Sequence, residues 1–314
     1  MTSDISSLIQ TLKDNNLLIT SSVTIIYQLC FFSIAWTYKF DKVTDFAGGS
    51  NAIVISLLTY FLAETHSTRQ LVITLCACLW GTRLSAFLLY RILQTEEDRR
   101  FDEIRQYFFK FLGFWIFQMI WVFTICLPVT FTNSPNYTRG IAPKFGTLLD
   151  LLGLFCFVFG WVSESVSDIQ KYNFSKTRKS GLEIIQVGLW KYSRHPNYFG
   201  EILLWFGVYL ISLSSILPNA SSQLGLLGIF SPSITAFLLL FVSGIILQEP
   251  KKEKEFLEAN QYQKWINYTN ETSPLVPLPN NFYKSIPKFL RTWVLLDLPV
   301  FHSVRIGDKA KKSK

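Results

Sequence analysis

Apolar residues in this chain fall into long runs, and short polar stretches separate the runs. A helix needs roughly 20 mainly apolar residues to cross the hydrocarbon core of a bilayer, and these runs have about that length. The pattern therefore predicts an all-α integral membrane protein with about seven transmembrane helices. The expected spans cover residues 17–37, 46–63, 70–93, 108–131, 145–166, 197–217 and 224–248.

Composition agrees with this pattern, since 49% of the residues are hydrophobic and 16% are aromatic. A soluble protein with this sequence would need several consecutive helices that are apolar on every face, which excludes that class. The first run is too long for the apolar part of a cleaved signal peptide, so we expect it to remain as a span. We expect one membrane domain over residues 1–280, followed by an interfacial segment and a basic cytosolic tail over residues 281–314.

Basic residues predict the orientation of the chain. Lys and Arg gather at residues 91–110, at residues 164–195 and after residue 248, whereas the alternate loops are poor in both. Cytosolic loops of membrane proteins carry this excess, which predicts a lumenal or external N-terminus and a cytosolic C-terminus. An odd number of spans fits the same orientation.

The end of the chain, Lys311-Lys312-Ser313-Lys314, resembles the dilysine retrieval signal of endoplasmic-reticulum membrane proteins. It predicts a multi-pass protein of that membrane, and the alternative is an ordinary solvated basic tail. Residues 282–301 mix Lys and Arg with apolar residues and contain two prolines. They are too polar to span, so we expect them to lie on the cytosolic leaflet.

The net charge of +8 lies in loops and the tail, which points to anionic lipid or nucleotide and not to nucleic acid. All five cysteines lie inside apolar runs, so we expect reduced packing residues, and no zinc-site spacing is present. The chain also lacks a glycine-rich dinucleotide fingerprint, a phosphate-binding loop and the signatures of common hydrolases.

The densest group of chemically useful residues is Gly188–Glu201, just before the sixth apolar run. Pro196 suits the first position of a helix, which places His195 before the helix and puts Asn197 and Glu201 on one face. Free N–H groups of the first turn, together with Arg194, can hold an anion such as a phosphate. The alternative is a basic cap with interfacial aromatic residues.

Other charged residues lie within or at the ends of the spans, where charge is costly and often functional. They converge at the predicted cytosolic face, as expected for a polar pocket between helices, although ion pairs that hold helices together remain an alternative. These residues are Asp45, Arg83, Glu164, Asp168, Glu201 and Glu249, together with the polar Asn197. Asp98 and Arg100 lie in the basic loop between the third and fourth runs, where they could bridge helices or hold a phosphate; the alternative is a solvated charged turn.

The run Gly188–Glu201 resembles the signature of the steroid 5α-reductase-like membrane proteins, in a branch related to 3-oxo-5α-steroid 4-dehydrogenases and sterol reductases. The resemblance spans roughly residues 40–280. It implies a seven-helix membrane fold that holds NADPH in a cytosol-facing cavity and reduces an activated C=C bond of a sterol or other lipid. Further matches, in order, are Asp45, Trp80-Gly81-x-Arg83, Glu97-Asp98-x-Arg100-Phe101, Glu164-x-x-x-Asp168-x-Gln170, Ser243-Gly244 and Ser273-Pro274-Leu275-Val276-Pro277.

The resemblance also implies roles for individual residues. Asp45, Tyr198 and Glu201 are the implied catalytic residues. Trp80 stands where the steroid enzymes have a tyrosine, and the Arg and His expected after Ser243-Gly244 are absent, which argues against a 3-oxo-steroid substrate. The expected cofactor-binding residues are Arg83, Asp98, Arg100, Asp168, Lys176, Arg178, Arg194, His195, Asn197, Tyr198 and Glu201.

Two other functions remain open at this point. Isoprenylcysteine carboxyl methyltransferases share a similar Arg-His-Pro-x-Tyr turn and bind S-adenosylmethionine nearby. A non-enzymatic membrane protein, whose polar cluster binds lipid or joins helices, is the third possibility.

Overall fold

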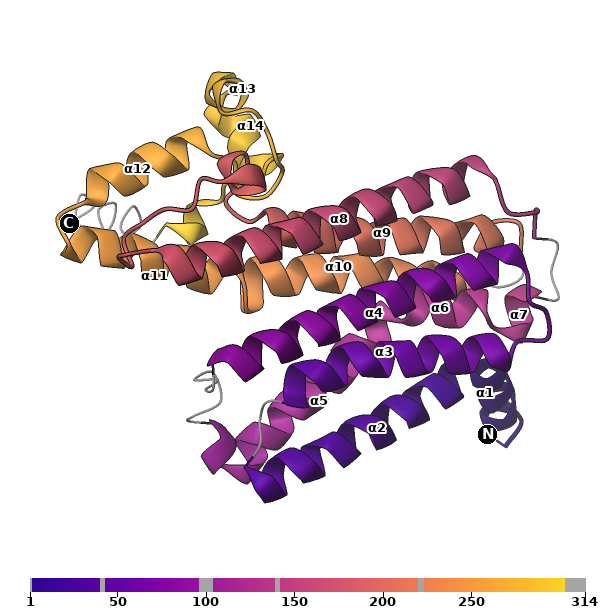
Figure 1. The fold of residues 1–314 in the computed structure, drawn as a ribbon. Coiled ribbons are helices and arrows are strands. Elements are labelled where there is room, and N and C mark those ends of the chain that lie inside the picture. Colours follow the sequence, from indigo (N-terminus) through magenta and orange to yellow (C-terminus); the bar gives the residue numbers. More distant parts are fainter. Residues whose placement is uncertain (1, 40–42, 96–103, 139–141, 220–222, 303–314) are drawn as a thin grey trace. The chain divides into compact units, whose positions relative to one another are not determined.

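The computed structural model describes residues 2–39, 43–95, 104–138, 142–219 and 223–302 (Figure 1). These residues form helices and no strand, apart from an isolated bridge between Ser193 and Ser273. The elements are α1 (Thr2–Asp14), α2 (Leu17–Tyr38), α3 (Val43–Phe61), α4 (Thr68–Thr95), η2 (Ile104–Gln106), α5 (Phe108–Ile125), α6 (Leu127–Thr132), α7 (Pro135–Thr138), α8 (Leu148–Thr177), η3 (Gly188–Lys191), α9 (Pro196–Ile216), η4 (Gln223–Ile229), α10 (Phe230–Phe237), η5 (Leu238–Val242), α11 (Ile245–Glu258), α12 (Tyr262–Glu271), α13 (Asn280–Ser285), α14 (Lys288–Trp293) and η6 (Pro299–Phe301).

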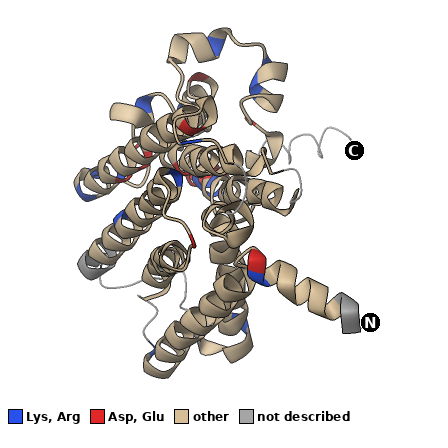
Figure 2. Ribbon diagram, turned by 90° about the vertical axis from the view of Figure 1, so that its right-hand side faces the viewer, with Lys and Arg blue, Asp and Glu red and all other residues tan. Residues whose placement is uncertain are grey.

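Within the described ranges, six helical stretches are long and apolar enough to cross a membrane, and α3 contributes a shorter apolar stretch, Phe46–Phe61. Figure 2 shows long helical stretches without Lys, Arg, Asp or Glu. An all-helical membrane protein is thus confirmed, whereas seven spans and their orientation stay predictions. The six stretches are Leu17–Tyr38, Thr68–Tyr90, Phe108–Ile125, Leu148–Thr177, Pro196–Ile216 and Gln223–Glu258.

Two of the predicted spans differ from the helices observed. The run expected over 108–131 is divided, because α5 ends at Ile125 and α6 begins beside Pro128, which has no N–H to continue the first helix. The run expected over 224–248 is a succession of short elements. It passes through η5, a π-helical turn, and then bends at Ser243 and Gly244 before α11 begins.

The chain divides into two compact units, which we describe separately. Unit 1 comprises residues 1–157 and 205–234, and unit 2 comprises residues 158–204 and 235–314. In unit 1, α4 packs against α3, and the rings of Trp80 and Trp205 lie 4.8 Å apart. A buried amide network joins three of its helices, since Gln118 donates to Gln28 and Gln28 donates to Asn51.

Glycines allow α8 and α9 to approach closely within each unit (Figure 1). A Cβ atom on Gly153 would lie 2.6 Å from the Gly207 carbonyl oxygen in unit 1, and a Cβ atom on Gly160 would lie 2.6 Å from the Gly200 carbonyl oxygen in unit 2. Small residues at such positions let apolar helices pack backbone against backbone, which is a common means of association in membranes.

We expect Gly153→Ala to destabilise the protein by about 1–3 kcal/mol, because its methyl group would press on backbone atoms of α9 that cannot rotate away. Gly113→Ala is the matched control, since a Cβ atom there meets no atom of the described residues within 4 Å. The control should be neutral or more stable by up to about 1 kcal/mol. Thermal unfolding in detergent measures both variants, and equal loss of stability would contradict the packing described here.

Candidate functional site

Local hydrogen bonds fix the backbone at the start of α9. Gly188 has a φ of 53°, which favours glycine, and a Cβ atom there would strike Gln170. The hydroxyl of Ser193 donates to the Leu275 carbonyl oxygen at 2.7 Å, and Arg194 N–H donates to the Ser273 carbonyl oxygen at 2.8 Å. The helix then begins at Pro196, as the sequence predicts.

The Arg194 guanidinium lies between two carboxylates in unit 2. It is 3% exposed, with Nη1 3.2 Å from Glu249 Oε2 and Nη2 2.7 Å from Asp297 Oδ1. Burial lowers the pKa of Arg194, but the charges of Glu249 and Asp297 outweigh it and hold that pKa above its ordinary value. The guanidinium is therefore charged and already neutralised within the protein, and its predicted role toward phosphate stays a prediction.

His195 completes this group. Its Nε2 lies 3.0 Å from Glu249 Oε1, and its ring stacks on Tyr198 with centroids 5.2 Å apart. Burial lowers the pKa of His195 below its ordinary value, and this effect exceeds the opposing hydrogen bond to Glu249. A neutral imidazole that donates from Nε2 presents a lone pair at Nδ1, and Nδ1 is buried without a partner among the described residues.

We expect the protein to become less stable as the pH is lowered, because His195 is buried in its neutral form. Below about pH 6.5 the unfolded chain binds a proton that the buried, neutral His195 of the folded protein does not bind. The free energy of unfolding should then fall by up to about 1.4 kcal/mol per pH unit, until the pH reaches the lowered folded pKa. Chemical unfolding at several pH values in this range measures the slope.

His195→Gln should remove this part of the slope, whereas the exposed His66 serves as control and His66→Gln should leave it in place. Glu249, Arg194 and Lys171 also act on the His195 ring, so the comparison is made at constant ionic strength. If the free energy of unfolding of His195→Gln depends on pH as steeply as that of the parent protein, the pH dependence does not come from His195.

Asn197 and Tyr198 stand at the first turn of α9. Asn197 Nδ2 donates to Asp168 Oδ1 on α8 at 3.1 Å, and Asn197 Oδ1 is buried with no hydrogen-bond partner in the described parts of the chain. The Tyr198 hydroxyl accepts a hydrogen bond from Gln248. Glu201 follows one turn after Asn197 and is half-buried. The structure thus gathers Asp168, His195, Asn197 and Tyr198 in unit 2.

The other predicted site residues are placed differently. Lys176 and Arg178 are exposed at the end of α8 in unit 2, and Lys176 Nζ lies 4.4 Å from the Tyr172 ring centroid. Arg83 lies on α4 in unit 1, with its guanidinium 5.5 Å from the Phe87 ring centroid. Asp98, Arg100 and the Asp45 side chain, together with the predicted retrieval signal at the end of the chain, lie outside the described residues.

A cavity of about 120 Å³ opens beside Arg194, His195 and Glu249 in unit 2. A neighbouring hollow of about 540 Å³ shares the lining residues Glu183, Ile184 and Tyr268 with it. The cavity combines aromatic walls with lysines, an environment suited to a planar ring and nearby negative charge. The remaining walls include Lys171, Trp190, Lys252, Phe256 and Trp265.

Sequence reasoning missed the role of Asp297, which lies in the segment expected on the membrane surface. Besides its bond to Arg194, Asp297 accepts a hydrogen bond from the Tyr283 hydroxyl at 3.0 Å. Burial raises its pKa, but His302 and Arg194 lower it further, so the carboxyl stays ionised. A single acid among Val294–Phe301 is the signal that could have revealed it, because an unpaired charge there is costly.

Within residues 282–301, the helix α14 is exposed: Phe289 is 70% and Trp293 is 66% accessible. Phe301 and Tyr283, in contrast, are buried in unit 2. The expected position on the cytosolic leaflet therefore remains a prediction for α14 (Lys288–Trp293), whereas the residues on either side of α14 pack inside the unit.

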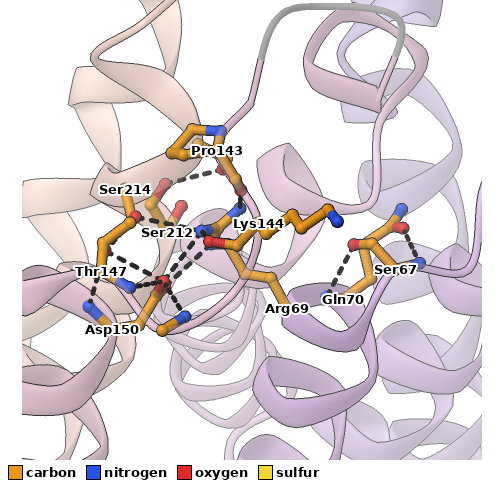
Figure 3. Close-up of polar contacts among 11 residues, drawn as sticks. Ser67, Arg69, Gln70, Pro143, Lys144, Thr147, Asp150, Ser212 and Ser214 are labelled. Carbon is orange, nitrogen blue, oxygen red and sulfur yellow. Dashed lines mark hydrogen bonds and ion pairs between the residues drawn. The ribbon is translucent and has the colours of Figure 1, made fainter.

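A second polar cluster lies in unit 1, around Arg69 and Asp150 (Figure 3). Arg69 Nε and Nη2 each lie 2.8 Å from an Asp150 oxygen, a buried two-point ion pair. Asp150 Oδ2 also accepts hydrogen bonds from the N–H groups of Gly146 and Thr147, and the Thr147 hydroxyl accepts one from Asp150 N–H. Asp150 therefore caps the start of α8 while it neutralises Arg69.

Comparison with known proteins gives a family but no described activity. A family model described as "Protein of unknown function (DUF1295)" matches residues 31–269. An uncharacterized protein of Schizosaccharomyces pombe is 28% identical over 215 residues, which cover 58% of this chain and 61% of that protein. The chain thus spans about three fifths of the length of this curated relative. No solved structure matches the chain.

Proposed function

Since this chain belongs to the DUF1295 family, whose description gives no activity, we propose a function from its site: NADPH-dependent reduction of an activated C=C bond in a sterol or other membrane lipid. The observation that carries the proposal is the pair of buried acceptor atoms at the start of α9, Asn197 Oδ1 and His195 Nδ1, which have no partner among the described residues. The resemblance of Gly188–Glu201 to reductases supports it independently.

The two acceptor atoms fit what a nicotinamide cofactor offers. A buried polar atom without a partner costs about 1–3 kcal/mol, so a ligand that supplies donors recovers this energy. Ribose hydroxyls and the carboxamide N–H group of NADPH are such donors. Its phosphates suit Lys171 beside the cavity, and the exposed Lys176 and Arg178 at the end of α8.

The residues of this chain would then position the reactants and move a proton. When bound, NADPH supplies the hydride. Tyr198 accepts a hydrogen bond from Gln248 and stacks on His195, which fixes its ring and leaves its O–H for a substrate carbonyl. Glu201 lies one turn further along α9, where it can return a proton to Tyr198. Asp168 holds the Asn197 amide in its orientation.

The proposal includes the orientation and location predicted from the sequence. With the start of α9 on the cytosolic side, nucleotide reaches the site from the cytosol, while a lipid substrate arrives from the bilayer. The endoplasmic-reticulum membrane is the proposed location, because the terminal lysines resemble a retrieval signal that acts from the cytosol.

We expect Asn197→Leu to weaken NADPH binding about tenfold, because it removes one acceptor and leaves the ligand donor unpaired. Asn173→Leu is the matched control on the exposed surface of α8 and should bind like the parent protein. Titration of the detergent-purified full chain with NADPH measures both. Equal affinity in the two variants would count against the site.

A further inference from the structure

A larger cavity, of about 590 Å³, lies in unit 1 beside Arg69, whose polar contacts are drawn in Figure 3. This volume falls within the roughly 300–1,000 Å³ typical of ligand pockets. Arg69 stands at the start of the candidate span Thr68–Tyr90, and Ser215 stands at the end of the candidate span Pro196–Ile216. Since both residues line the cavity, it lies at the depth where spans end and lipid headgroups begin.

One wall of the cavity has more donors than acceptors. Gln70 Oε1 accepts from the Thr65 hydroxyl and the Ser67 N–H, and Gln70 Nε2 is buried with no hydrogen-bond partner among the described residues. Arg69 Nη1 carries two N–H groups and donates to one described acceptor, the Pro143 carbonyl oxygen. Lys144 is exposed at the rim and makes no ion pair with the described residues; Figure 3 draws its side chain reaching toward Gln70.

Hydroxyl groups elsewhere in the cavity offer hydrogen-bond acceptors. The hydroxyls of Thr138 and Ser215 each donate to a backbone carbonyl oxygen of their own helix. Their oxygen atoms therefore keep lone pairs that can accept from a ligand. No Asp or Glu is among the described residues that line the cavity. The cavity thus matches a ligand that carries a negative group and free hydroxyls together.

We propose that this cavity binds the headgroup of a phospholipid whose phosphate carries a hydroxylated alcohol, such as glycerol or inositol. The phosphate would face Lys144, Arg69 and Gln70, and the alcohol would face the hydroxyl oxygens. Leu148, Leu151 and Phe155 form an exposed apolar stripe on α8, along which the acyl chains would lie. This site is independent of the proposed reductase site in unit 2.

Native mass spectrometry of the full chain tests the proposal, with one lipid added at a time. Phosphatidylglycerol and phosphatidylinositol should be retained more strongly than phosphatidylserine, whose headgroup has the same net charge but lacks these hydroxyls. The double variant Lys144→Gln with Ser215→Ala should lose about tenfold in retention, since one charge and one hydrogen bond are removed. Lys13→Gln, at an exposed lysine of unit 1, is the control and should match the parent protein.

Three outcomes would overturn the proposal. Equal retention of phosphatidylserine would show that charge alone acts. Equal retention by the double variant and Lys13→Gln would place the lipid elsewhere. Full competition by soluble glycerol 3-phosphate or inositol phosphate at equal concentration would identify the ligand as the free compound. Binding of NADPH by the double variant should equal that of the parent protein, which separates this site from the reductase site.

Discussion

Glu249→Ala is expected to destabilise the protein by about 3–5 kcal/mol, the usual cost of removing one partner from a buried ion pair. Glu249 is 2% exposed and holds both Arg194 and His195. Without it, the guanidinium keeps one carboxylate, Asp297, and His195 Nε2 loses its acceptor. Buried charge and a buried unsatisfied donor then add to the lost contacts. Chemical unfolding in detergent measures the change.

Glu255→Ala is the matched control on the same helix. Glu255 pairs with Lys252 at 2.6 Å, but both side chains are about one third exposed, so its loss should cost less than about 1 kcal/mol. Amide hydrogen exchange adds a local readout, since protection around Ser193 and Ser273 should fall in Glu249→Ala alone. Similar losses in both variants would mean that the Arg194 group contributes little to unit 2.

Asp150→Ala should cost a similar amount, about 3–5 kcal/mol, because it leaves the buried Arg69 without its carboxylate and removes the acceptor of the Gly146 and Thr147 N–H groups before α8. Asp150 is fully buried and accepts from Arg69 at two points. Thermal unfolding and hydrogen exchange at the start of α8 measure the effect in unit 1.

Asp14→Ala provides the comparison for Asp150→Ala. Asp14 accepts a hydrogen bond from Gln10 on the exposed side of α1, and its replacement should change stability by no more than about 0.5 kcal/mol. If Asp150→Ala and Asp14→Ala lower the free energy of unfolding equally, then the contacts of Asp150 with Arg69 and with the start of α8 do not stabilise unit 1.

Features that depend on local sequence could be predicted. The apolar runs gave the helices because crossing a bilayer requires length and hydrophobicity within one segment. The start of α9 at Pro196 followed from the missing N–H of proline, which is a property of one residue. Asn197 and Asp168, both predicted as site residues, are indeed hydrogen-bonded to each other.

Features that depend on distant residues could not be predicted. Arg194 and Asp297 are 103 positions apart, and no periodicity in the sequence links them. The same holds for Arg69 and Asp150, which are 81 positions apart. The Arg194 side chain therefore looked available for a phosphate from the sequence, whereas folding brings two carboxylates to it. The break between α5 and α6 could have been anticipated from Pro128, but the π-helical turn at Leu238–Val242 has no such marker.

The most direct test of the proposed reductase is equilibrium binding of nucleotides to the detergent-purified full chain. NADPH and S-adenosylmethionine are titrated separately, with tryptophan fluorescence as the signal. We expect saturable binding of NADPH at submillimolar concentration and no binding of S-adenosylmethionine. Binding of S-adenosylmethionine instead, or no saturable binding of NADPH up to millimolar concentration, would contradict it.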